Sequence, residues 1–405
     1  MASGRKRFPR ESLQSWGFLV YRGIARKNGS GSAANVLVLR ANRDVGRESS
    51  LGIFLSSREA GGDLNRVAGV DARLKFGANW FATLQVVASA TRETGKADLF
   101  GPAYRATVSR AGRRLVYTAD FNDRSPEFRT ALGFVERTNL RSLDQTVSYK
   151  WMPASSRLLS FGPELVGSEV RDHANAPLDR TLTPKFSFEW PGPTKLSLFY
   201  QDARVGLRPE EVPSLGQRLT FDQDRAGLEF STSFTRSLTI TMKASTGDGI
   251  NLVPAPEDQP VSAELDELSA AVDVRPSTRL SLAASYLLTQ LTDRAGASIF
   301  TDHIVRGRAN FQFTRALSAR AIVQFDDLRA AEARTSLPGR RNLNIDLLLT
   351  WLKTPGTALY VGYNNNLQNL DPSLTSGSYG LLRTARGLLS DGRQFFIKAS
   401  VLLRK

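Results

Sequence analysis

Three features of the sequence together predict an all-β fold, a closed antiparallel transmembrane β-barrel of about 18 strands, with about 16 as the alternative count. Apolar and polar residues alternate over stretches of about ten residues, as in a strand with one apolar and one hydrophilic face. Short turns and longer polar connections follow these stretches in alternation. Aromatic residues stand beside the short turns, where membrane barrels carry an interfacial girdle.

The strand pattern is clearest around residue 240. Leu238, Ile240 and Met242 alternate with Thr239 and Thr241, so one face of this strand is apolar and the other is hydrophilic. The same pattern, followed along the chain, predicts strands at residues 49–56, 65–76, 80–90, 103–110, 114–121, 143–151, 156–163, 181–190, 194–203, 223–234, 237–246, 263–274, 280–290, 303–313, 317–326, 341–352, 357–364 and 393–403.

The predicted connections differ in length between the two edges of the sheet. Turns of two to five residues lie at one edge, and long polar connections lie at the other, which is typical of outer-membrane barrels with short periplasmic turns. The predicted long connections are residues 91–102, 122–142, 164–180, 204–222, 247–262, 291–302, 328–340 and 365–392.

The aromatic girdle is predicted at the short-turn edge. Tryptophan prefers the level of lipid headgroups, where its ring is buried and its N–H stays hydrated. Four of the five tryptophans and two phenylalanines stand where a predicted strand meets a short turn. The predicted girdle comprises Trp80, Trp151, Trp190, Trp351, Phe234 and Phe313.

Composition excludes several classes of protein. The chain has 405 residues, of which 41% are hydrophobic, and it contains no run of about 18 apolar residues, so a helical membrane protein is excluded. The chain has no cysteine, so it forms no disulfide, thiolate metal site or cysteine nucleophile.

The chain is strongly basic, with 54 lysines and arginines against 39 acidic residues and a net charge of +15. Such an excess raises the question of nucleic-acid binding. The basic residues are spread along the chain without a basic helix, a zinc knuckle or an aromatic RNA-binding motif. We therefore expect no nucleic-acid partner, and a basic lumen or contact with anionic lipid explains the charge.

The beginning of the chain carries no secretory signal. Its first ten residues are basic, but Glu11, Gln14 and Arg22 interrupt any apolar segment that follows. Because an outer-membrane barrel must be exported, we expect the chain to be a truncated form of a longer precursor. The expected location is the cell outer membrane, with lipid and the barrel-assembly machinery as partners.

Charged residues at alternate strand positions are predicted to face the lumen. An arginine or lysine that faced lipid at the midplane of a barrel would cost about 2 to 4 kcal/mol. Two interpretations remain open: the charges fill the lumen and pair with one another, or their positive excess selects anionic or polar solutes. The predicted lumen-lining residues are Asp71, Arg73, Lys75, Lys185, Glu189, Lys195, Arg225, Glu229, Lys243, Arg306, Arg308, Arg320, Asp346 and Lys398.

Three segments resemble one known family. They are Arg66-Val-Ala-Gly-Val-Asp-Ala-Arg73, Phe121-Asn-Asp-Arg-Ser-Pro-Glu-Phe-Arg-Thr-Ala-Leu-Gly-Phe-Val-Glu-Arg137 and Arg393-Gln-Phe-Phe-Ile-Lys-Ala-Ser400. They are similar to a C-terminal outer-membrane β-barrel domain of unknown function that follows a carbohydrate-binding module of family nine.

The opening segments, Phe8-Pro-Arg-Glu-Ser-Leu13 and Trp16-Gly-Phe-Leu-Val-Tyr-Arg-Gly-Ile-Ala-Arg-Lys-Asn28, resemble the last strands of that module. The resemblance implies two parts: residues 1–45 as the remnant of a periplasmic carbohydrate-binding-module-like β domain, and residues 46–405 as the barrel.

No pattern in the chain predicts catalysis. His173 and His303 lie far apart in the sequence and lack a nucleophile elbow or metal-ligand spacing. We predict no catalytic residue, no metal and no cofactor. The predicted function is a channel or surface-recognition protein for polar solutes, with saccharide-derived solutes as one candidate class. The alternatives are a soluble all-β carbohydrate-binding protein and a glycoside hydrolase component, for which acidic pairs such as Glu210-Glu211 and Asp326-Asp327 would supply carboxylates.

Overall fold

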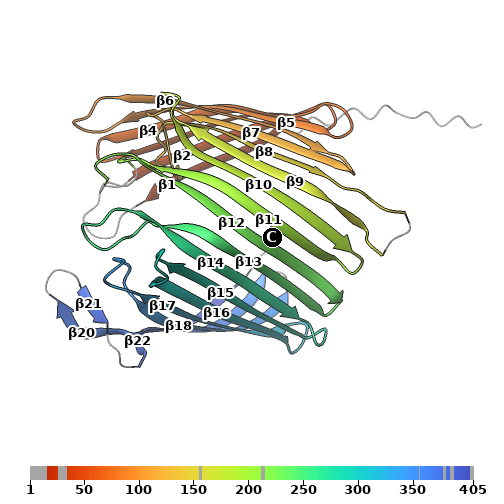
Figure 1. The fold of residues 1–405 in the computed structure, drawn as a ribbon, viewed down its shortest axis with the longest axis vertical. Coiled ribbons are helices and arrows are strands. Elements are labelled where there is room, and N and C mark those ends of the chain that lie inside the picture. The colour runs from red at the N-terminus through yellow and green to blue at the C-terminus, as the bar shows by residue number, and fades with distance from the viewer. Residues whose placement is uncertain are drawn as a thin grey trace, which may run out of the picture. The chain divides into compact units, whose positions relative to one another are not determined.

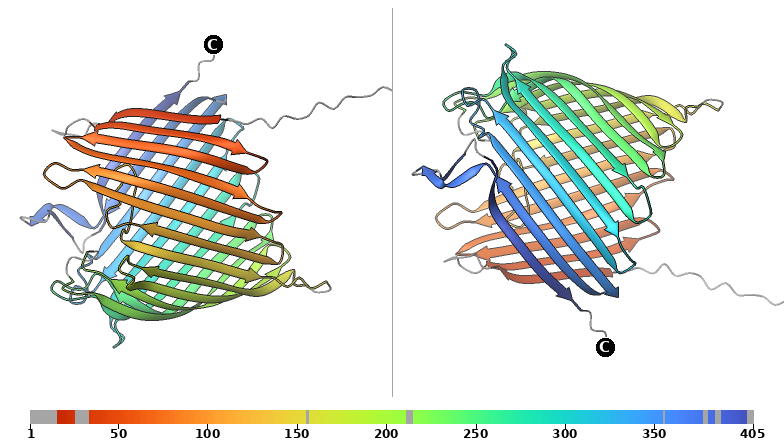
Figure 2. Two further views of the ribbon diagram at one scale, coloured as in Figure 1. Left: turned by 90° about the horizontal axis from the view of Figure 1, so that it is seen from above. Right: turned by 90° about the horizontal axis from the view of Figure 1, so that it is seen from below.

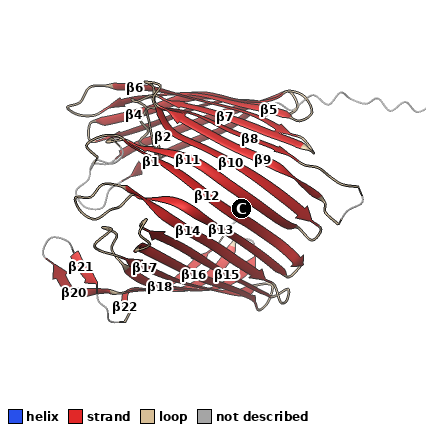
Figure 3. Cartoon of the chain, viewed as in Figure 1, coloured by secondary structure: helices blue, strands red, loops and turns tan. Residues whose placement is uncertain are grey.

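The computed structural model describes residues 16–25, 34–154, 157–210, 215–354, 356–376, 380–383 and 387–401. Figure 3 shows strands and loops and no helix in this part of the chain. No helix long and apolar enough to cross a membrane is present among these residues. The all-β fold that alternation predicts is confirmed.

The strands follow one another along the chain (Figure 1). They are β1 (Trp16–Ala25), β2 (Ala34–Val45), β3 (Ser49–Ala60), β4 (Asp63–Lys75), β5 (Trp80–Arg92), β6 (Leu99–Ala111), β7 (Leu115–Arg124), β8 (Leu140–Tyr149), β9 (Ser160–Arg171), β10 (Pro177–Trp190), β11 (Thr194–Leu207), β12 (Leu219–Thr235), β13 (Leu238–Asn251), β14 (Val261–Val274), β15 (Leu280–Thr292), β16 (Ser298–Gln312), β17 (Leu317–Ala330), β18 (Arg340–Thr354), β19 (Thr357–Gln368), β20 (Leu370–Ser376), β21 (Gly380–Arg383) and β22 (Leu389–Ser400).

Twenty of these strands, β1–β19 and β22, belong to one sheet, and β20 pairs with β21 in a separate two-stranded sheet. Within the large sheet, strands pair antiparallel in chain order, for example β4 with β5 and β16 with β17, and β19 pairs with β22 across the separate hairpin of β20 and β21. Figure 2 shows the strands in this succession. The chain forms two compact units, residues 1–150 with 164–182 and residues 151–163 with 183–405, which are described separately below.

All eighteen predicted strands are present, and the predicted count is low by two because β1 and β2 also join the sheet. The pattern hides β2 because Val36-Leu37-Val38-Leu39 is a continuous apolar run without alternation. In the structure β2 pairs along its whole length with β3 across a short turn at Gly46, whose φ of 68° favours glycine.

The sheet therefore continues across the predicted boundary at residues 45 and 46, and unit 1 has no division there. That residues 1–45 derive from a carbohydrate-binding module stays a prediction. Residues 1–15, which contain part of the resembling segment, lie outside the described residues.

Two predicted long connections are much shorter in the structure. Residues 164–180 and 291–302 shorten to turns at residues 172–176 and 293–297, because β9, β10 and β16 extend into them. Both turns have the pattern Asp-X-Ala-Asn/Gly-Ala, and the aspartate accepts the backbone N–H of the closing alanine in each, at 2.8 Å. In the second turn this bond holds the pKa of the Asp293 carboxyl below its ordinary value.

The short-turn edge also differs from the prediction at one place. The connection between β8 and β9 spans residues 150–159, longer than the predicted turn of two to five residues. Trp151 is held there by an isolated bridge to Phe161, and their ring centroids lie 5.5 Å apart. Other predicted girdle residues also contact aromatic neighbours at this edge, as Trp80 contacts Phe76 and Trp190 contacts Phe188.

The apolar face of the sheet is exposed in both units. In unit 1, 59% of Ile53 is exposed, and Val70 and Val86 are similarly uncovered; in unit 2, 42% of Val323 is exposed, together with Val305. Soluble monomers rarely expose a contiguous apolar surface of this kind. A strand that faces lipid requires an exposed apolar face on one side of the sheet and a polar face on the other.

We expect a cation on the apolar face to destabilise the protein. Ile240→Arg and Val323→Arg should each cost about 2 to 4 kcal/mol of folding free energy in lipid if these residues lie near the midplane. Thr241→Arg, on the opposite face of the same strand as Ile240, should cost far less. Denaturant unfolding from lipid vesicles measures the difference, and equal losses on both faces would contradict the lipid-face assignment.

Candidate functional site

Cross-strand pairing brings the predicted lumen-lining residues to one face of the sheet in each unit. Residues directly opposite in paired strands point to the same side. In unit 2 this side can be followed from Lys195, opposite Ser231 in β12, through to Arg306, opposite Ser285 in β15. In unit 1 it carries Asp71, Arg73 and Lys75, and in unit 2 Lys185, Glu189, Lys195, Arg225, Glu229, Lys243, Arg306, Arg308, Arg320, Asp346 and Lys398. We call this side the polar face.

Most charges on the polar face of unit 1 are paired. The guanidinium of Arg40 donates to both carboxylate oxygens of Asp71, at 2.5 and 2.8 Å, which is the bidentate geometry that arginine favours. Lys75 pairs with Glu48 at 2.5 Å, and Arg73 lies over the ring of Phe81. Strand alternation does not indicate Arg40, because β2 contains a continuous apolar run and shows no alternation.

Part of the polar face of unit 2 is neutralised in the same way. Glu229 lies between two cations, with its carboxylate oxygens 3.0 Å from Lys185 and 3.8 Å from Lys243. Arg225 pairs with Glu267. The interpretation that lumen charges pair with one another therefore fits these residues.

We expect Glu229→Gln to destabilise the protein, because it leaves two lysines close together without their shared counter-charge. The loss should be about 1 kcal/mol, since both pairs are partly exposed. Glu169→Gln is the matched control: it breaks the exposed pair with Arg171 at the end of β9. Urea unfolding of the reconstituted protein should show a smaller loss for the control, and a larger loss for the control would contradict the bridging role.

Three arginines on the polar face are not neutralised in this way. Arg306 and Arg320 form no ion pair with any described residue, and Arg308 approaches Asp273 only at 4.0 Å. Arg308 lies opposite Ala283, and Arg320 lies opposite Asn310. Because β16 and β17 are paired, these cations lie on adjacent strands and their fields add.

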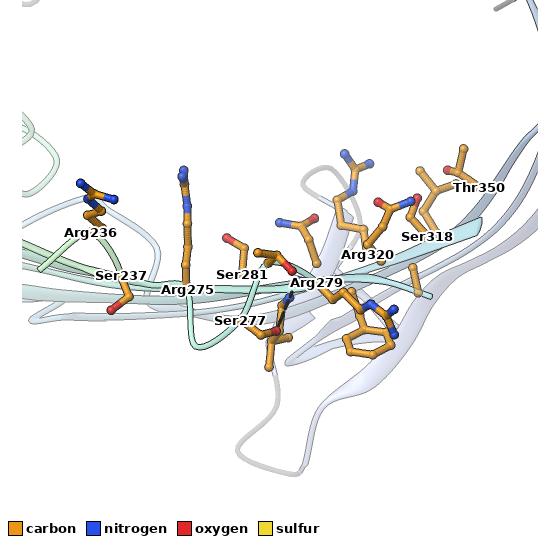
Figure 4. Close-up of a pocket in the computed structure, with 16 residues that line it drawn as sticks. Arg236, Ser237, Arg275, Ser277, Arg279, Ser281, Ser318, Arg320 and Thr350 are labelled. Atoms are coloured by element: carbon orange, nitrogen blue, oxygen red, sulfur yellow. Dashed lines mark hydrogen bonds between the residues drawn. The ribbon is translucent and has the colours of Figure 1, made fainter. Parts of the chain in front are cut away.

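Arg320 also lines a hollow at the short-turn edge of unit 2. The hollow has a volume of about 910 Å³ and is bordered by the turns that follow β12 and β14. Figure 4 shows Arg236, Arg275 and Arg320 extending to the same side of the sheet, with Ser281 between Arg275 and Arg320 and Thr350 beyond Arg320. Arg236 and Arg275, like Arg320, have no ion pair with the described residues.

Arginine and hydroxyl groups arranged around a hollow can donate several hydrogen bonds to one anionic group. Strand alternation does not indicate Arg236 and Arg275, because these arginines lie in turns. Their signal is the recurrence of a cation at short-turn positions, in Arg236-Ser237 and Arg275-Pro276-Ser277.

Both histidines and Asp327 are held in structural contacts, and Glu211 lies outside the described residues. The imidazole of His173 lies 2.8 Å from Asp123, and His303 hydrogen-bonds to the hydroxyl of Tyr286 at 2.9 Å. Asp327 pairs with Arg329 and Arg341, and it lies on the opposite face of β17 from Asp326. Among the described residues no group of three histidine or acidic side chains could hold a metal ion.

Comparison with known proteins supports the fold class. No family model matches the chain, and no curated protein sequence matches it. The siderophore receptor PirA of Acinetobacter baumannii superposes with a TM-score of 0.51 and 9% identity, covering 89% of this chain and 69% of the receptor. The siderophore receptor PirA of Pseudomonas aeruginosa gives a TM-score of 0.52 and 11% identity, covering 89% and 73%.

At such low identity these similarities show the fold alone. The fold is that of an outer-membrane β-barrel, which confirms the predicted class. The resemblance to the barrel domain that follows a carbohydrate-binding module stays a prediction.

Proposed function

We propose that this protein is an outer-membrane barrel that passes polar solutes along its polar face and favours anions. The observation that carries the proposal is the set of cations that lack a close carboxylate, Arg306, Arg308 and Arg320. The apolar face suits contact with outer-membrane lipid. Barrels of this size class enclose space for water.

The charge arrangement supports anions over cations. Elsewhere on the polar face, carboxylates such as Glu229 and Asp71 offset their neighbouring cations. At β16 and β17 that compensation is weak, and the hollow adds Arg236 and Arg275. An anion within about one Debye length, roughly 8 Å at physiological salt, would feel several of these charges at once.

Replacing Arg306, Arg308 and Arg320 with glutamine should remove most of the anion preference. In a planar bilayer with a salt gradient, the unaltered protein should give a reversal potential shifted toward the anion. The triple variant should lose most of that shift, because glutamine keeps hydrogen bonding and removes the charge.

The matched control replaces Arg92, Arg171 and Arg294 with glutamine. These arginines lie at the long-loop edge and already pair with carboxylates, and the control removes the same formal charge. It should keep the shift. Cation preference in the unaltered protein would contradict the proposal, and so would the absence of any conductance.

The two edges should lie on opposite sides of the outer membrane, with the short turns in the periplasm. Because the chain has no cysteine, Asp258→Cys and Ser277→Cys each introduce a unique thiol at an exposed loop position. Asp258→Cys should react with an impermeant thiol reagent on intact cells, and Ser277→Cys should react only after the outer membrane is opened. The reverse pattern would invert the topology.

Surface recognition of a saccharide-derived solute by the barrel is the second candidate and depends on the family resemblance. The alternative of a soluble all-β saccharide-binding protein is tested by detergent partition. A soluble protein would remain in the aqueous phase, whereas the proposed barrel would enter the detergent phase. We propose no catalytic step, and hydrolysis of a glycan by the purified protein would contradict this.

A further inference from the structure

The connection between β7 and β8, residues 125–139, binds to the polar face of unit 1. Its contacts are with β4, β5 and β6, at positions that share a face with Asp71: Asn65, Ser89 and Gly101. We call residues 125–139 the inward segment.

Two buried side chains hold the inward segment by its backbone. Asn65, only 7% exposed, accepts the N–H of Ala131 at 2.8 Å and donates to the carbonyl of Arg129 at 3.1 Å. Ser89, only 1% exposed, accepts the N–H of Arg129 at 3.0 Å and donates to the carbonyl of Gly101. Buried polar groups that satisfy one another in this way fix a backbone position firmly.

Gly101 allows the inward segment to approach β6 closely. A Cβ atom at this position would lie 2.2 Å from the backbone nitrogen of Phe128, which no real contact permits. Phe128 itself is buried. Only glycine therefore fits beneath the segment.

Further contacts hold the inward segment at its start, within it and near its end. At the start, the N–H of Ser125 donates to the carbonyl of Pro102. Within the segment, the guanidinium of Arg129 donates to the carbonyls of Pro126 and Phe128. Near its other end, Arg137 pairs with Asp179 of β10.

Two connections of unit 2 are joined to each other. The connections that follow β13 and β17 bind each other at the strand ends, where Thr335 donates to the carbonyl of Val253 at 2.5 Å. Asn251 donates there to the carbonyl of Arg334.

We propose that the inward segment is a specificity determinant that narrows the solute path and restricts passage to compact polar solutes. This inference rests on the proposed function, because the polar face must line the path. Backbone hydrogen bonds to buried side chains hold the segment against the polar face in the folded protein.

The test displaces the segment and measures the size limit of the path. In Gly101→Ala the added methyl group forces the backbone of Phe128 away, while Gly307→Ala is the matched control, since a Cβ atom there meets nothing within 4 Å. A second variant replaces residues 127–136 with two glycines. Single-channel conductance is recorded in polyethylene glycols of increasing size. Both segment variants should conduct more and admit larger polymers, and the control should match the unaltered protein. An unchanged size limit in the replacement variant would overturn the proposal.

A separate readout reports the segment itself. Ser125→Cys places a thiol at a buried position whose hydroxyl has no hydrogen-bond partner. Labelling by a small maleimide should be slow in the otherwise unaltered chain and faster by about tenfold or more when Gly101→Ala is added. Equally fast labelling in both proteins would show that the segment is not held, and equally slow labelling would show that Gly101 does not set its position. Either result would overturn the proposal. If labelling behaves as expected but no variant conducts, the passage function fails and the size-limiting role falls with it.

Discussion

The structure depends on the pairing of backbone N–H and C=O groups between consecutive strands. In a hydrocarbon surrounding, each unpaired backbone group would cost several kcal/mol, so a membrane-spanning segment must satisfy all of its own polar groups. Antiparallel pairing achieves this between neighbouring strands, as β13 pairs with β14 from Leu238 to Asn251 without interruption. The polar groups of the side chains are then free for other roles.

Pairing of this kind assigns side chains strictly to two faces. Leu282 and Ala309 lie opposite each other on the apolar face, and Ala283 and Arg308 lie opposite each other on the polar face. A slip of one residue would exchange the faces and expose arginines to lipid. The energetic difference between the faces therefore holds the register, and it also concentrates charge on one side of a thin sheet. That concentration explains why ion pairs, uncompensated arginines and an attached loop segment all occur on the polar face.

Sequence patterns predict the elements whose alternation is clean and miss what depends on contacts distant in the chain. The pattern around Ile240 and Val323 is sufficient to place β13 and β17. It fails at β2, because an apolar run of consecutive residues has no period of two. It also underestimates β9 and β16, since strands that extend beyond lipid no longer need an apolar face.

The candidate site is also partly predictable from local sequence pattern and partly dependent on distant contacts. Strand parity correctly puts Arg306 and Arg320 on one face with Lys243. Which charges are neutralised depends on partners such as Asp273 and Glu229, and it follows only from the register between strands. The attachment of Ala131 to Asn65 joins residues far apart in the sequence, and no local pattern indicates it.

The succession of pairings has a consequence for how such a chain can change over time. From β2 to β19 each strand pairs with its sequence neighbours, so one hairpin with its turn is a nearly independent unit. Inserting or removing a hairpin leaves the alternation of all other strands intact and changes the width of the sheet by about 10 Å, two strand spacings. The similar five-residue turns at Asp172 and Asp293, each closing a hairpin, fit growth by copying such units. The hairpin is therefore the smallest unit by which the sheet can grow or shrink, and the width of its polar face can vary in steps of one hairpin.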